Sequence, residues 1–153
     1  MKKKIEIKIL NQLIGSTIPV PSYATKGSAG IDLRACIKES KIIKPKETTI
    51  IKSGLAININ DPSIMAVITP RSGLGIKHGI VLGNLIGICD SDYQGEITIG
   101  LWNRGDIPFT VNQGDRICQM VFVPVIPVEF ETVKEFSVKT ERDTGGLGHT
   151  GIT

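Results

Sequence analysis

The chain has 153 residues, with 18 Lys and Arg against 15 Asp and Glu, so its formal net charge is +3. A single domain of this length buries a sizeable core, and so small a charge does not indicate a nucleic-acid partner. No apolar run approaches the length that spans a membrane. The basic start, Met1–Lys4, resembles the first part of a signal peptide, but Glu6 and Lys8 interrupt the apolar residues that follow.

The three cysteines, Cys36, Cys89 and Cys118, are odd in number and far apart, without a Cys-x-x-Cys pair. This pattern favours buried, reduced thiols over a disulfide scaffold or a zinc site. It therefore predicts a cytoplasmic protein.

Seventeen glycines and eight prolines, with few helical repeats, indicate many short strands. Apolar alternation and turn residues predict strands, in chain order, at 4–9, 31–35, 41–52, 55–59, 64–69 and 116–125, with turn signals at 44–46, 53–54 and 60–62. We expect the last strand to finish at a sheet edge, because Pro124 and Pro127 stand at its end. Strands at this spacing are typical of an all-β barrel or jelly roll.

The alternation of apolar residues ends near Glu135. We therefore predict a β-barrel domain over 1–135 and a flexible, Gly-rich tail over 136–153.

The segment Gly87–Gly95 (GICDSDYQG) places two carboxylates and a tyrosine between two apolar runs, 80–86 and 97–101. This pattern predicts a β-hairpin. Asp90 directly follows an apolar run, so we expect it at a half-sheltered strand end, where a carboxylate is held rigidly beside a substrate. An ordinary hairpin tip with solvated acids is the competing interpretation.

Two further segments are candidates for binding anions. Pro70–Gly75 (PRSGLG) predicts a short helical turn beginning at Gly73 and capped by Ser72, with Arg71 beside its free N–H groups. A plain strand-to-turn junction is the alternative. Gly114–Met120 (GDRICQM) adds a turn and a strand that carries Gln119, a neutral donor and acceptor.

The tail holds the third anion candidate, Arg142–Gly151 (RDTGGLGHTG). Its last part matches Gly-x-Gly-x-x-Gly, but only two residues follow, so it cannot open the helix of a dinucleotide site. Glycine N–H groups and an arginine fork nevertheless suit phosphate oxygens. A structureless tail is the alternative.

Taken in order, these segments resemble the homotrimeric dUTPases, which split dUTP into dUMP and pyrophosphate. The resemblance covers nearly the whole chain and rests on five motifs: Ala29–Ala35 (AGIDLRA), Pro70–Gly75, Gly83–Gly95 (GNLIGICDSDYQG), Gly114–Gln119 and Arg142–Gly151.

The resemblance implies a jelly-roll-like β-barrel subunit and a homotrimer with three shared active sites. One subunit supplies the first, second and fourth motifs, a neighbour supplies the third, and the last subunit's tail closes over the nucleotide. It also implies a dUTP diphosphatase that keeps uracil out of DNA and supplies dUMP for dTMP synthesis, without nucleic-acid or membrane partners.

By the same resemblance, Asp90 is the general base that activates water for in-line attack on the α-phosphorus. Tyr93 packs against deoxyribose and excludes a 2′-hydroxyl. Asn84 and the backbone near Gly87 read the uracil edge. The phosphate chain is held by Arg71, Ser72, Gly73, Gln119 and Arg142, with Leu147, Gly148, His149 and Thr150 in the closing tail.

Mg²⁺ is implied as the cofactor, held by the triphosphate and waters without direct protein ligands. The resemblance places Asp32 near the phosphates and the metal, acting through water or by orienting other groups. Asp92 is interpreted as a residue that shapes the hairpin, not as a second base.

Three residues depart from the family pattern. Leu147 stands where phenylalanine usually stacks on uracil, Asp143 replaces a common glycine, and Cys89 replaces Ile or Val.

Two alternatives stay open. A dCTP deaminase shares the fold, but its Ser-Ser-Leu-Ala-Arg-like element is absent here. A non-catalytic nucleotide-sensing or protein-binding member of the fold is disfavoured by the presence of Asp90, Tyr93, Gln119 and Arg142.

Overall fold

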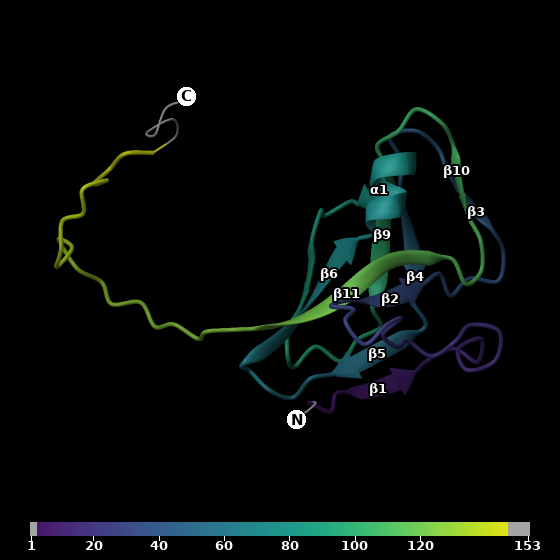
Figure 1. Cartoon of the computed structure of the whole chain (residues 1–153), viewed down its shortest axis with the longest axis horizontal. Helices are drawn as coiled ribbons and strands as arrows, with labels where there is room; N and C mark the ends of the chain where they lie inside the picture. The colour runs from purple at the N-terminus through teal and green to yellow at the C-terminus, as the bar shows by residue number, and fades with distance from the viewer. Residues whose placement is uncertain (1–2, 147–153) are drawn as a thin grey trace.

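The computed structural model describes residues 3–146 and is almost entirely β, with one short helix in that range (Figure 1). This confirms the predicted all-β class. The elements in chain order are β1 (Glu6–Ile9), β2 (Ile31–Arg34), β3 (Lys41–Ile43), β4 (Thr48–Lys52), β5 (Leu55–Asn58), β6 (Ile64–Pro70), α1 (Ser72–His78), β7 (Ile80–Leu82), β8 (Gly87–Cys89), β9 (Thr98–Asn103), β10 (Phe109–Val111) and β11 (Arg116–Pro124).

The strands form two main sheets and two short strand pairs. One main sheet has the order β2-β11-β6-β8 and the other β4-β9-β7, while β1 pairs with β5 and β10 with β3. All these pairings are antiparallel. Alternate residues of both main sheets, such as Leu33, Ile51 and Leu101, are fully buried in one hydrophobic cluster. Two sheets that close on a shared core give the jelly-roll-like fold.

The predicted strand over 41–52 is wrong as a single element. It divides into β3 and β4 because Lys46 adopts a positive φ of 66° and turns the chain there. The two halves then join different partners, β10 and β9. The turn signal at 44–46 marks the division.

The predicted hairpin around residues 87–95 is only partly correct. β7 and β9 do pair, with Leu82 opposite Leu101. Leu85, at φ 63°, turns the chain after β7, so Gly87–Cys89 forms a separate strand, β8, that pairs with β6. Residues 90–97 therefore pass from one main sheet to the other and do not close a simple hairpin.

The last strand, predicted over 116–125, is β11. It lies between β2 and β6 as far as Met120, and from Val121 to Pro124 it pairs with β6 alone. Its end is thus an open edge on one side, as its prolines predict.

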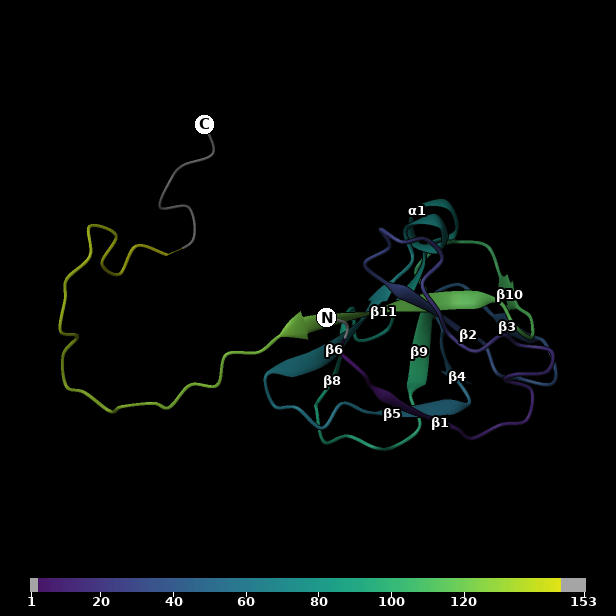
Figure 2. The same ribbon diagram turned by 60° about the horizontal axis from the view of Figure 1, so that its bottom comes forward.

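From residue 125 to residue 146 the chain forms no strand or helix and runs away from the barrel (Figures 1 and 2). Three apolar side chains alternate along its first part: Ile126, Val128 and Phe130 are 85%, 73% and 94% exposed. The boundary predicted at residue 135 stays a prediction.

Candidate active site

Asp32, Arg71, Arg116 and Gln119 lie together where β2, β11 and β6 meet. We call these four residues the arginine cluster. Asp32 Oδ1 accepts a hydrogen bond from Arg71 Nε at 2.8 Å, and Oδ2 accepts one from Arg116 Nη1 at 3.2 Å. Two guanidinium groups share one carboxylate, so these three residues carry a net positive charge. Charge of this sign on planar, multidentate donors suits phosphate.

Gln119 is placed by strand register. It pairs with Asp32 on β2 and with Thr69 on β6, and its Nε2 donates to the Pro70 carbonyl at 3.2 Å. Gly30 lies against the same side chain: a Cβ added at Gly30 would stand 2.5 Å from Gln119 Oε1. The first motif therefore supplies both a carboxylate and the space that the fourth motif's glutamine occupies.

Helix α1 begins directly after the arginine cluster. The prediction that Ser72 caps it is wrong, because Ser72 is its first helical residue and Arg71 is the N-cap, without a side-chain capping bond. The Arg71 carbonyl accepts the first helical bond from the Gly75 N–H at 2.9 Å. Arg71 thus both starts the helix and pairs with Asp32, while Ser72 and Gly73 stand exposed beside it.

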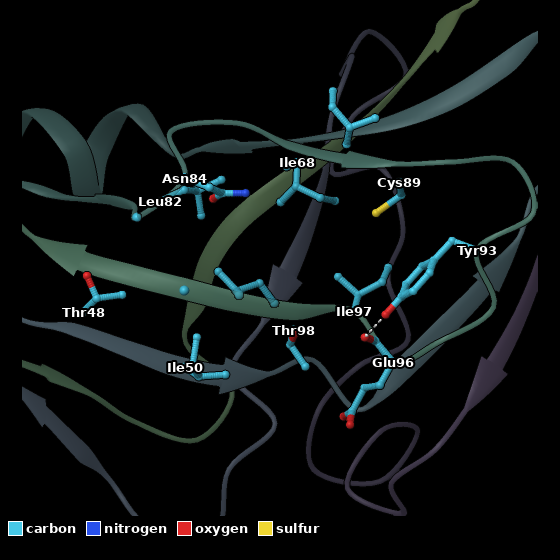
Figure 3. A pocket seen from close by; sticks show the side chains of 15 residues that line it. Thr48, Ile50, Ile68, Leu82, Asn84, Cys89, Tyr93, Glu96, Ile97 and Thr98 are labelled. Atoms are coloured by element: carbon cyan, nitrogen blue, oxygen red, sulfur yellow. Dashed lines mark hydrogen bonds between the residues drawn. The ribbon is translucent and has the colours of Figure 1, made fainter.

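A cavity of about 440 Å³ opens between β8 and the start of β9 (Figure 3). Asn84, Gly87 and Tyr93 all line it, together with apolar side chains that include Ile68 and Ile97. This volume lies within the range of small-molecule sites. The mixture of an apolar interior and polar edges suits a planar base.

Tyr93 stands at one side of this cavity, and its hydroxyl donates to the Glu96 carbonyl at 3.1 Å (Figure 3). Asp90 directly follows β8. The Tyr93 N–H donates to the Asp90 carbonyl at 3.2 Å, and the Asn60 N–H donates to Ser91 at 2.9 Å. The loop backbone is thus anchored at two points. Asp90 does occupy a strand end, but in the single chain it is exposed and not half-sheltered.

The arginine cluster and Asp90 lie at opposite ends of β6. Cys89 pairs with Ala66, whereas Gln119 pairs with Thr69 and Arg71 follows Pro70. Asp90 therefore lies level with Met65, about six residues from Arg71, which corresponds to roughly 20 Å along a strand. A single chain does not bring its own Asp90 to its own arginine cluster.

Arg142 is exposed, and its Nε donates to the Gly145 carbonyl at 2.9 Å, within its own turn. The structure brings it to neither the cavity nor the arginine cluster. The other tail residues predicted to bind substrate, Leu147, Gly148, His149 and Thr150, lie outside the described residues.

Asp143 has a positive φ of 44°, the left-handed conformation that glycine adopts most easily. This backbone conformation explains why the dUTPases that the chain resembles commonly have glycine at this position. Aspartate is among the few other residues that enter this region readily.

All three cysteines are free and buried, as predicted. Burial, and to a smaller extent nearby Asp32, raise the pKa of Cys118 to about 12. Burial, and then Asp90, also raise the pKa of Cys89. These thiols are neutral at pH 7.

Within residues 3–146, no three His, Cys, Asp or Glu side chains gather into a group that could hold a metal ion. Over the same range, no helix has the length and apolar character needed to cross a membrane.

The roles of two residues of the site, Arg116 and Glu96, cannot be inferred from the separate sequence motifs. Arg116 shares Asp32 with Arg71, and only its place in the fourth motif signals it. Glu96 accepts from the Tyr93 hydroxyl through its main chain and binds the 52–54 turn through its side chain. Neither residue carries a local pattern that reveals its partner, because each partner is far away in the sequence or is a backbone atom.

Comparison with known proteins agrees with this geometry. The dUTPase family model matches residues 16–151. The chain is 57% identical over 151 residues to the deoxyuridine 5′-triphosphate nucleotidohydrolase of Cronobacter sakazakii, covering 99% of both chains. It is 59% identical to the enzyme of the same name from Haemophilus influenzae, covering 97% of this chain and 98% of that one.

Solved structures share the fold at lower identity. A mutant dUTPase of Staphylococcus bacteriophage 80alpha with dUpNHpp superposes with a TM-score of 0.86 at 23% identity, covering 99% of this chain and 100% of that one. A mutant dUTPase of the Staphylococcus aureus phage phi11, described with a structural Mg(II) ion, gives a TM-score of 0.77 at 22% identity and covers 88% and 99%.

Proposed function

The chain belongs to the dUTPase family, and we propose that it hydrolyses dUTP to dUMP and pyrophosphate. The observation that carries this proposal is the position of Asp90, an exposed carboxylate directly after Cys89, which lines a base-sized cavity that Tyr93 also borders. With the base in this cavity, the sugar lies beside Tyr93 and the phosphates leave the pocket on the Asp90 side. Hydrolysis removes uracil nucleotides from the precursors of DNA and supplies dUMP for dTMP synthesis.

Asp90 is the proposed general base. It takes a proton from a water whose oxygen attacks the α-phosphorus, and the bond from that phosphorus to the bridging oxygen of the β-phosphate breaks. Pyrophosphate leaves with the electron pair. Asn84 and the backbone at Gly87 contact the base, and Tyr93 excludes a ribose 2′-hydroxyl.

Arg71, Ser72, Gly73 and Gln119 are proposed to hold the phosphate chain. The net positive charge around Asp32 supports this assignment, because donors fixed before substrate arrives stabilise developing negative charge without reorganising. Arg142, Leu147, Gly148, His149 and Thr150 are proposed to close over the nucleotide from the tail.

Mg²⁺ is the proposed cofactor, held by the triphosphate and water. Both Asp32 oxygens already accept from arginines, so this carboxylate fits a contact through water better than direct ligation. Bound there, the ion supplies charge neutralisation to the phosphate oxygens.

We infer that the enzyme is a homotrimer with shared sites. The separation of Asp90 from the arginine cluster along β6 supports this, because a second chain can bring the two parts together. The exposed apolar side chains of Leu85, Ile86 and Ile88 beside the cavity are also suited to burial against another copy. The buried, reduced thiols favour the cytoplasm as the compartment.

Replacing Asp90 tests the proposal. Asp90→Asn keeps the size of the side chain but removes its basicity, so pyrophosphate release from dUTP falls by about 10²–10⁴-fold. Binding of a non-hydrolysable dUTP analogue, measured by calorimetry, stays within a few-fold. Asp92→Asn is the matched control, two residues away and also exposed, and it keeps most of the activity. An Asp90→Asn enzyme with a third of wild-type activity rules out the assigned base.

The deaminase alternative predicts ammonia release from dCTP, and the non-catalytic alternative predicts nucleotide binding without product. Measuring pyrophosphate from dUTP and ammonia from dCTP on one preparation separates both from the proposed reaction.

A further inference from the structure

The position of the Tyr93 ring depends on the residues that follow it. Tyr93 is 46% exposed, so packing holds it only in part. Its hydroxyl donates to the Glu96 carbonyl at 3.1 Å, and its ring lies across Gly95. A Cβ added at Gly95 would stand 2.5 Å from the Tyr93 Oη and 2.7 Å from Cζ. The ring is therefore held by its packing against the Gly95 backbone and by one hydrogen bond to the Glu96 carbonyl.

Glu96 connects this ring to the barrel. One carboxylate oxygen accepts from the Gly54 N–H at 3.1 Å, and the other lies 3.1 Å from Lys52 Nζ. The next residue continues the attachment: the Ile97 N–H donates to the Leu55 carbonyl at 2.9 Å, and the Ile97 carbonyl accepts from the Ser53 N–H at 3.1 Å. The carbonyl that fixes Tyr93 is thus held by the turn between β4 and β5.

The two contacts of the Glu96 carboxylate differ in strength. The Glu96 side chain is 22% exposed and that of Lys52 is 67% exposed. An ion pair with so exposed a lysine contributes little. A carboxylate that accepts from a partly buried backbone N–H makes the stronger, charge-assisted bond. The contact with Gly54 therefore provides most of the anchoring.

We propose that Glu96 is a positioning residue for sugar selection: through Gly54 it fixes the backbone carbonyl that holds Tyr93 against the deoxyribose. The inference rests on the proposed function and assigns part of its sugar discrimination to a residue that acts through Tyr93. A tyrosine ring excludes the 2′-hydroxyl of a ribose by steric overlap. This exclusion discriminates between dUTP and UTP only while the ring keeps its position.

The test measures kcat/KM for dUTP and for UTP and compares their ratio between variants. Glu96→Ala removes both contacts of the carboxylate, so the Tyr93 ring is no longer held in place and excludes the 2′-hydroxyl less well. The ratio of kcat/KM for dUTP to kcat/KM for UTP then falls about tenfold. Glu96→Gln keeps an oxygen for the Gly54 N–H and restores the ratio to within about threefold of wild type. Lys52→Ala removes only the ion pair and leaves the ratio within about twofold.

Tyr93→Phe gives an independent test, since it deletes only the hydroxyl that donates a hydrogen bond to the Glu96 carbonyl. It lowers the ratio as Glu96→Ala does, and the double variant Tyr93→Phe/Glu96→Ala shows no further loss, because both changes break one connection. Equal melting temperatures for Tyr93→Phe and wild type exclude a folding defect.

Three outcomes overturn the inference: a Glu96→Ala variant that slows dUTP and UTP equally, an unchanged ratio in Tyr93→Phe, or fully additive losses in the double variant. A wild-type enzyme without dUTP turnover contradicts the proposed function instead, so the two failures are distinguishable.

Discussion

At the scale of single residues, the arginine cluster shows how one carboxylate organises two cations. Asp32 holds Arg71 and Arg116 through separate oxygens, and Arg71 Nη1 also donates to the Arg116 carbonyl at 3.3 Å. Without Asp32 the two guanidinium groups would repel each other near the same point. With it, they keep a fixed geometry and an excess of positive charge. Gly30 completes the arrangement by leaving room for Gln119.

Gly30→Ala tests this dependence on space. The new methyl group overlaps Gln119 Oε1, so the glutamine must rotate and lose its bond to the Pro70 carbonyl. A displaced Gln119 also loses its proposed contact with the phosphate chain, and one hydrogen bond to a charged group corresponds to about 1.5–3 kcal/mol. We therefore expect kcat/KM for dUTP to fall by about 10–100-fold. Gly27→Ala is the control, because no atom lies within 4 Å of its added Cβ. Steady-state kinetics with wild-type activity in Gly30→Ala would contradict the placement.

At the scale of elements, β11 links the core to the site. It lies between β2 and β6 and carries both residues of the cluster and residues of the core: Arg116 is exposed and Gln119 partly exposed, while Ile117, Cys118 and Met120 are buried. The same strand therefore supplies phosphate-binding groups and a fully buried thiol. Because the thiol is neutral in the folded protein, its burial makes stability depend on pH.

Stability should decrease at alkaline pH through Cys118. Its pKa is raised from 9.0 to about 12 in the folded protein, chiefly by burial. The stabilisation is complete below pH 9 and is lost as pH rises from 9 to 12, because only the unfolded chain ionises there. At pH 10 this loss is on the order of 1 kcal/mol. Urea unfolding of wild type and Cys118→Ala at pH 7.5 and pH 10 measures it.

The alanine variant starts less stable at pH 7.5 because it leaves a cavity. Its further loss at pH 10 is smaller than that of wild type, since Cys36 and Cys89 are common to both proteins. Equal losses would show that the Cys118 thiol does not titrate as described.

At the scale of the whole molecule, the proposed general base and the proposed phosphate-binding residues of one chain lie apart. Asp90 lies level with one end of β6, and the arginine cluster lies at the other. The stretch after β11 leaves the barrel with apolar side chains exposed. Both features have a simple explanation if the working molecule contains several copies.

Subunit mixing tests the shared site. An Asp90→Asn chain and a chain truncated before Arg142 are each expected to be inactive. Unfolding and refolding them together restores part of the activity, because some sites then receive an intact Asp90 and an intact tail from different chains. Light scattering on the wild type gives the mass of a trimer. A fully active monomer would exclude this model.

Much of the fold and the list of candidate residues follow from the sequence alone. Period-two alternation is a local property, so strands such as β6 and β11 can be predicted from a few neighbouring residues. The five motifs are local as well, and they identify the family and name Asp90, Arg71 and Tyr93. The burial of three unpaired thiols also follows from composition and spacing.

The tertiary structure decided which parts meet. The partner of β8 is β6 and not the following strand, because pairing depends on the packing of the whole barrel and not on nearness in sequence. That choice separates Asp90 from the arginine cluster. The pairing of β11 with β2 joins Arg116 to Asp32, and the segment between β8 and β9 brings Glu96 to Gly54. Each of these contacts links residues from distant segments, and only a closed core fixes their register.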